Sequence, residues 1–155
     1  MSQLRNYFFL SVCLFVLSCT SNNTQEESTS SEESELPKEE QIEKTLYDDV
    51  MAVHDEMMPK MEEMMALKGK LIELSDSLRE SGATEESTRV ASAAEKIEVA
   101  DEAMMGWMHQ FEPNMEGMSH QQRVDYLTSQ KNKMDSVKVV MQEAIATGRS
   151  LTANR

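Results

Sequence analysis

The sequence is poor in cysteine, and its two cysteines, Cys13 and Cys19, both lie near the N-terminus. Arg5 precedes an apolar run from Tyr7 to Leu17, which is too short for a comfortable membrane span and is typical of a secretory signal. We expect Cys13 to leave with this signal and Cys19 to carry lipid. The remaining chain then has no free thiol and no disulfide, so packing alone must hold its fold together.

The four residues Val16, Leu17, Ser18 and Cys19 resemble the lipobox that lipoprotein signal peptidase cuts. We therefore predict a lipoprotein signal peptide over residues 1–18, with Cys19 as the lipidated first residue. Acyl chains on Cys19 would hold the protein at a membrane surface, because each buried methylene contributes about 0.8 kcal/mol. The predicted location is the cell envelope, at the periplasmic face or outer surface of an outer membrane. An ordinary signal with a chance cysteine is the alternative.

Residues 19–37 have almost no apolar side chains and many acidic ones. Such a segment cannot bury enough surface to offset its ordering entropy, which predicts a lipidated cysteine followed by a disordered acidic tether. The formal net charge is −13, and loss of Arg5 with the signal makes it −14. This excess argues against nucleic acid as a partner. It is compatible with cation binding, or with a charged surface that keeps a tethered protein soluble.

Strand-type alternation and internal repeats are absent, and apolar residues instead recur at intervals of three or four positions, or of seven where one position is skipped, in three segments. The three series are Leu46, Val50, Val53, Met57, Met64, Leu67, Leu71, Leu74 and Leu78; Val90, Ala93, Ile97, Ala100, Met104, Trp107 and Phe111; and Val124, Leu127, Met134, Val137, Met141 and Ile145. Short connectors make consecutive helices antiparallel.

We therefore predict an all-α, up-down-up antiparallel three-helix bundle of coiled-coil type over residues 38–150. The last helix is expected to fray near Gly148, with residues 151–155 as a frayed C-terminus. Ser119 and Gln122 match a capping box at its start. The alternatives are one extended helical hairpin or a coiled coil that dimerises.

Motifs for catalysis are also missing. The chain has no free cysteine beyond the signal and lipobox, no serine or histidine in a recognisable nucleophile motif, and no phosphate-type glycine loop. Ferritin-like di-iron sites need Glu-x-x-His pairs on facing helices, and none occurs in the sequence. An enzyme is therefore not expected.

Methionine, in contrast, is abundant and clustered. Six of the fourteen methionines lie between Met51 and Met65, and five lie between Met104 and Met118. If the first two helices form a hairpin, facing residue numbers sum to about 165, so that His54 is level with Phe111 and Met61 with Met104. The two methionine clusters would then meet at one level of the bundle.

Thioether and imidazole ligands suit the soft ions Cu(I) and Ag(I). The candidate ligands are His54, Met58, Met61, Met104, Met105, Met108 and His109, and Trp107 is a candidate for cation-π contact with the ion. The alternative is that the stripe containing Met51, His54, Met58, Met61 and Met65 is a second apolar face. That face would fill gaps in the core, or would bind a protein partner or a second copy of the chain.

Pro59 interrupts this methionine-rich stretch. A proline removes the hydrogen bond to the carbonyl of Asp55, so it is expected to bend the helix there. The alternative is that Pro59 begins a new helix and leaves residues 54–58 as a joint.

The stretches VHDEMMPKM at 53–61 and MMGWMHQF at 104–111 occur in a short acidic chain with a lipobox. This combination resembles a group of small helical lipoproteins of Bacteroidota that often carry the label "viral A-type inclusion protein". The resemblance covers the signal, the tether and the first two helices, and it implies neither a viral function nor a known activity. His54, Met58, Pro59 and Met61 match the group. The group usually has valine in place of Met57, which argues against Met57 as a ligand.

Overall fold

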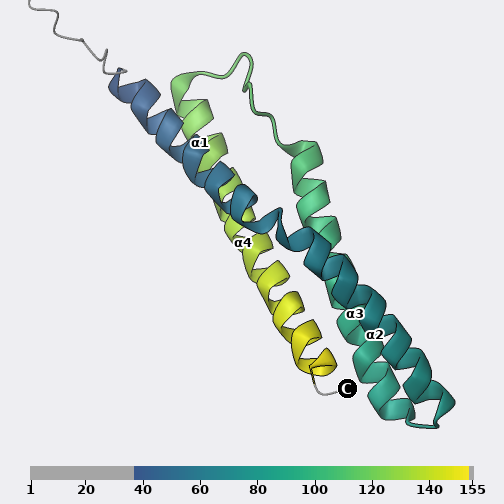
Figure 1. Ribbon diagram of the computed structural model, residues 1–155. Coiled ribbons are helices and arrows are strands. Elements are labelled where there is room, and N and C mark those ends of the chain that lie inside the picture. The colour runs from purple at the N-terminus through teal and green to yellow at the C-terminus, as the bar shows by residue number, and fades with distance from the viewer. Residues whose placement is uncertain (1–36, 154–155) are drawn as a thin grey trace, which may run out of the picture. The chain divides into compact units, whose positions relative to one another are not determined.

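The computed structural model describes residues 37–153, which are almost wholly helical and contain no strand. The helices are α1 (Lys38–Met57), α2 (Lys60–Glu80), α3 (Thr84–Gln110) and α4 (His120–Thr152), as Figure 1 shows. The all-α prediction is therefore confirmed for these residues. The predicted signal peptide, Cys19 and all but the last residue of the tether lie outside the described residues. No helix between residues 37 and 153 is long and apolar enough to cross a membrane.

Helices α2 and α3 form an antiparallel hairpin. The turn between them contains Gly82, whose φ of 83° is a left-handed conformation that glycine adopts without strain. Beyond the turn, the buried hydroxyl of Ser87 donates to the carbonyl of Ser75 at 2.8 Å, and the hydroxyl of Ser75 donates to the carbonyl of Ser87 at 3.1 Å. These small side chains let the two backbones lie close together while each of the two buried hydroxyls has a hydrogen-bond partner.

Three ion pairs show that α4 runs parallel to α1 and α2. From the start of α1 onward, Glu43 pairs with Arg123, Glu56 with Lys138 and Glu63 with Arg149. The residue numbers rise together on both sides, so the chain packs three long helical segments side by side.

Ser119 caps the N-terminus of α4. Its hydroxyl accepts a hydrogen bond from the Gln122 N–H, and the predicted capping box is present.

The first long segment changes partner at Pro59. Helix α1 ends at Met57, Met58 and Pro59 form a turn, and the Met61 N–H bonds to the carbonyl of Met58 at 3.1 Å. Before the turn, α1 packs on α4; after it, α2 packs mainly on α3 (Figure 1). A new helix, α2, begins after Pro59, as the alternative for Pro59 stated, so the first predicted helix is two helices. The turn is confined to residues 58 and 59, and residues 54–57 belong to α1.

The core is built from the predicted apolar series. Its fully buried larger side chains are Val50, Met57, Met64, Leu71, Val90, Ile97, Met104, Leu127, Met134 and Met141. The expectation that α4 frays near Gly148 is wrong. Gly148 is buried, Leu67 and Ile97 pack closely over it, and α4 continues to Thr152 while Leu151 packs on the core.

Candidate functional site

Three methionine doublets each divide between the core and the surface. In Met64-Met65 and Met104-Met105, the first side chain is 0% exposed, whereas the second is 40% exposed at Met65 and 39% at Met105. In Met57-Met58, the first is buried and the second is partly buried against the core. Neighbouring helical residues point about 100° apart, so one lies in the apolar series and the other at its edge. The edge methionines are the ones that a ligand can reach.

The Lys68–Glu98 ion pair joins α2 and α3 on this edge. The reciprocal hydrogen bonds of Ser75 and Ser87 place those two residues level, so facing residue numbers sum to about 162 and Lys68 reaches Glu98 across about one turn. Met61 lies seven residues before Lys68, and Met105 lies seven residues after Glu98. Met61 and Met105 are therefore offset by the same turn on the same side of the hairpin, and Met61 is level with the residue three positions before Met104, which was predicted to face it.

Two further thioethers lie on the same stretch. Met58 is three residues before Met61, and Met108 is three residues after Met105, so both lie about one turn further from the Gly82 end. Met58, Met61 and Met108 are partly buried and pack against the core. We use the name thioether groove for the row formed by Met58, Met61, Met105 and Met108. This row contains four of the seven predicted ligands.

The other three predicted ligands lie elsewhere. Met104 is a fully buried core residue. His109 is exposed on α3, one turn beyond Met105. His54 lies in α1, one turn before Met58, and its Nδ1 is 2.8 Å from the Asp55 carboxylate. An imidazole held at one nitrogen by a carboxylate is a common arrangement in metal sites, because it orients the other nitrogen.

Trp107 lies on a different face of α3 from Met105, because residues two apart in a helix do not share a face. Its ring stacks on Phe111 at 4.8 Å between centroids and lies 5.8 Å from the ring of His54. Its indole N–H donates to the buried side chain of Gln130 at 3.0 Å. His54 was predicted to lie level with Phe111, and its ring instead lies beside Trp107, one turn earlier in α3.

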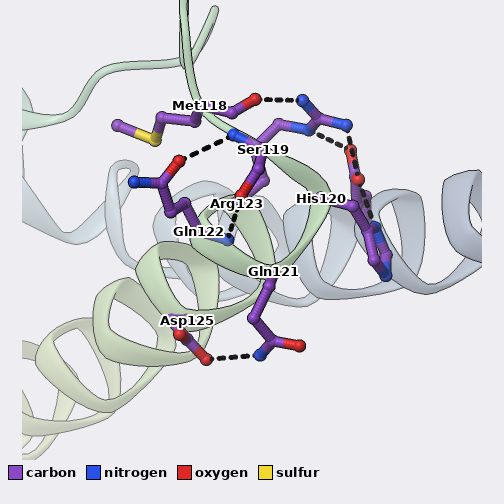
Figure 2. Close-up of polar contacts among 8 residues, drawn as sticks. Met118, Ser119, His120, Gln121, Gln122, Arg123 and Asp125 are labelled. Atoms are coloured by element: carbon purple, nitrogen blue, oxygen red, sulfur yellow. Dashed lines mark hydrogen bonds and ion pairs between the residues drawn. The ribbon is translucent and has the colours of Figure 1, made fainter.

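One polar cluster was missed by the sequence reasoning. Near the start of α1, Glu43 accepts from Arg123 Nε at 2.6 Å and from a terminal nitrogen of Arg123 at 2.8 Å, while His120 Nδ1 lies 2.6 Å away (Figure 2). Arg123 also donates to the carbonyl of Met118 at 2.6 Å. Hydrogen bonds from Arg123 and His120 lower the pKa of Glu43 from 4.5 to about 2. His120 therefore belongs to an ion-pair cluster between α1 and α4.

Within residues 37–153, no group of three or more histidine, cysteine, aspartate or glutamate side chains could hold a metal ion. Comparisons with protein-family models, with curated proteins and with solved structures found no match.

Proposed function

We propose that this protein is a non-enzymatic, lipid-anchored envelope protein whose helical domain binds Cu(I) or Ag(I) at the thioether groove. The observation that carries the proposal is that Met61 and Met105 lie on the same side of the hairpin with the same offset as Lys68 and Glu98, whose side chains meet. Four thioethers along one edge offer the neutral sulfur ligands that soft monovalent ions prefer. His54 and His109, each one turn from a groove methionine, are the candidate nitrogen ligands.

The remaining parts of the proposal concern location and packing. The lipobox at Cys19 supports an outer-membrane anchor, and the motif stretches support membership of the small Bacteroidota lipoprotein group. The spacing of three and four in the apolar series supports packing of the coiled-coil type between the helices. The negative charge of the chain favours cations over anions near the groove.

A second candidate function is docking of a protein partner or a second copy of the chain. It is favoured by three exposed apolar side chains on neighbouring helices, Ile72 of α2, Val99 of α3 and Val140 of α4. Ile72 and Val99 line one surface groove, and Val99 and Val140 line the next. Exposed apolar residues that adjoin one another mark interaction surfaces more often than isolated ones do.

The test is titration of the purified protein with Ag(I), and with Cu(I) under a competing chelator. Binding to the folded state alone stabilises it by about 2.7 kcal/mol at a hundredfold excess over Kd, so the melting temperature should rise. The variant Met61→Leu with Met105→Leu retains size and apolarity and should fold, but it should lose the rise. Zn(II) should have much less effect, because thioethers are poor ligands for it.

The matched control is Met134→Leu with Met141→Leu, which changes two core methionines of α4. This control should keep the full response to Ag(I). If the parent protein shows no shift, or if the groove variant responds as strongly as the parent, the metal proposal is wrong. Concentration-dependent self-association, abolished by Val99→Glu, would then favour the docking function.

A further inference from the structure

In two of the methionine doublets, one side chain is buried and its neighbour in the sequence is exposed to solvent. Met64 and Met104 are fully buried, whereas their neighbours Met65 and Met105 are exposed. An oxidant in solution must reach the sulfur atom to react with it. Because the members of a doublet are adjacent in sequence, any difference in their oxidation reports the tertiary structure and not the local sequence.

We infer that Met65 and Met105 are sites of reversible oxidation by hydroperoxides. In the reaction, a sulfur lone pair attacks one oxygen of hydrogen peroxide, an S–O bond forms and the O–O bond breaks. The departing hydroxide takes up the proton left on the transferred oxygen and becomes water. The thioether loses two electrons and becomes a sulfoxide, and the peroxide is reduced by the same two electrons. Methionine sulfoxide reductases reverse the modification.

The fold tolerates this modification at the two exposed positions. A sulfoxide is polar, and at Met65 or Met105 its oxygen can remain hydrated. The same oxygen on Met64 or Met104 would be buried among apolar side chains without a hydrogen-bond donor, which is costly. The exposed member of each doublet therefore takes up the oxidant while the core stays intact.

Oxidation at Met105 would also regulate the thioether groove, a consequence that depends on the proposed metal-binding function. A sulfoxide no longer offers the thioether sulfur that a soft ion prefers. Met65 lies one turn from Met61 and outside the groove, so its oxidation alone should leave metal binding unchanged. Oxidised protein should therefore lose Ag(I) affinity in proportion to the sulfoxide at Met105.

The experiment exposes the full-length protein to dilute hydrogen peroxide and follows each methionine by peptide mass spectrometry. Sulfoxide should form at Met65 and Met105 on the order of tenfold faster than at Met64 and Met104, because oxidation of the buried residues requires local opening. The helical dichroism signal should be retained. In urea-unfolded protein, both members of each doublet should react at the same rate.

Two variants make the outcome decisive. Met65→Leu with Met105→Leu should slow the early uptake of oxygen, whereas Met134→Leu in the core should not. Equal rates within the doublets of folded protein, or loss of helicity before Met65 and Met105 are oxidised, would overturn the inference. Absence of Ag(I) binding to unoxidised protein would refute the metal proposal and leave the oxidation pattern unaffected, so the two failures are distinguishable.

Discussion

Arg123 of α4 donates hydrogen bonds to both carboxylate oxygens of Glu43 in α1, although 80 residues separate them in the sequence. The pair joins the N-terminal parts of two parallel helices, and His120 contacts the same carboxylate. Only 16% of the Glu43 side chain is exposed, so its charge is partly shielded from water. The stability of the folded protein is therefore expected to depend on the charge of the Glu43 carboxylate.

The stability of the protein should depend on the charge of Glu43. Its folded-state pKa of about 2 lies below the usual 4.5, so the stabilisation is complete above pH 4.5 and is lost as pH falls towards 2. Glu43→Gln should lower the free energy of unfolding by roughly 1–2 kcal/mol at neutral pH, the scale of a hydrogen bond to a charged group. Urea unfolding at several pH values should show the difference from the parent vanishing near pH 2. The exposed Glu73→Gln is the control and should show no such trend.

Gln130→Leu should destabilise the domain, because it leaves the buried indole N–H of Trp107 without its acceptor. The expected cost is about 1–3 kcal/mol, measured by chemical unfolding. In a Trp107→Phe background the donor is gone, and the further cost of Gln130→Leu should be clearly smaller. Additive effects of the two substitutions would show that the hydrogen bond contributes nothing.

Gly148 offers a test of packing between α4 and the hairpin. A Cβ placed at this position meets Leu67 Cδ1 and Ile97 Cδ1 at 3.4 Å, which is the near limit of ordinary contact. Gly148→Ala should therefore keep most of the helix-propensity gain of about 1 kcal/mol and leave the melting temperature unchanged or higher. Gly148→Leu should lower stability by about 1–3 kcal/mol through overpacking. If Gly148→Leu left the stability unchanged, α4 would not pack closely against the hairpin at this position.

Cys19→Ala should abolish labelling of the protein by radioactive fatty acid. The protein should then appear in a soluble fraction or accumulate as a precursor, because the lipobox has lost its acceptor thiol. Cys13→Ala is the matched control and should be labelled normally, since Cys13 lies within the predicted signal. Fatty acid on the Cys19→Ala protein would contradict the lipobox interpretation.

The amino-acid sequence alone was sufficient to predict the helices and their buried faces. Apolar residues at three- and four-residue intervals predicted the faces that contain Val50, Ile97 and Met141, because helical periodicity is a local property. The capping pair Ser119 and Gln122 similarly marked a helix start. The facing of Met61 with α3 was predictable only to within about one turn, because the connection at Gly82 leaves the hairpin that much freedom of register.

Tertiary structure alone decided which helix each segment contacts and which side chains meet. Pro59 indicated a bend, but the exchange of α4 for α3 as the main partner depends on packing along the whole bundle. Local spacing could not show that His54 meets Trp107, or that Glu43 pairs with Arg123. It also could not place Gly148 beneath Leu67. Such contacts form between residues far apart in sequence, so they depend on the relative rotation and offset of packed helices, which periodicity within one helix does not encode.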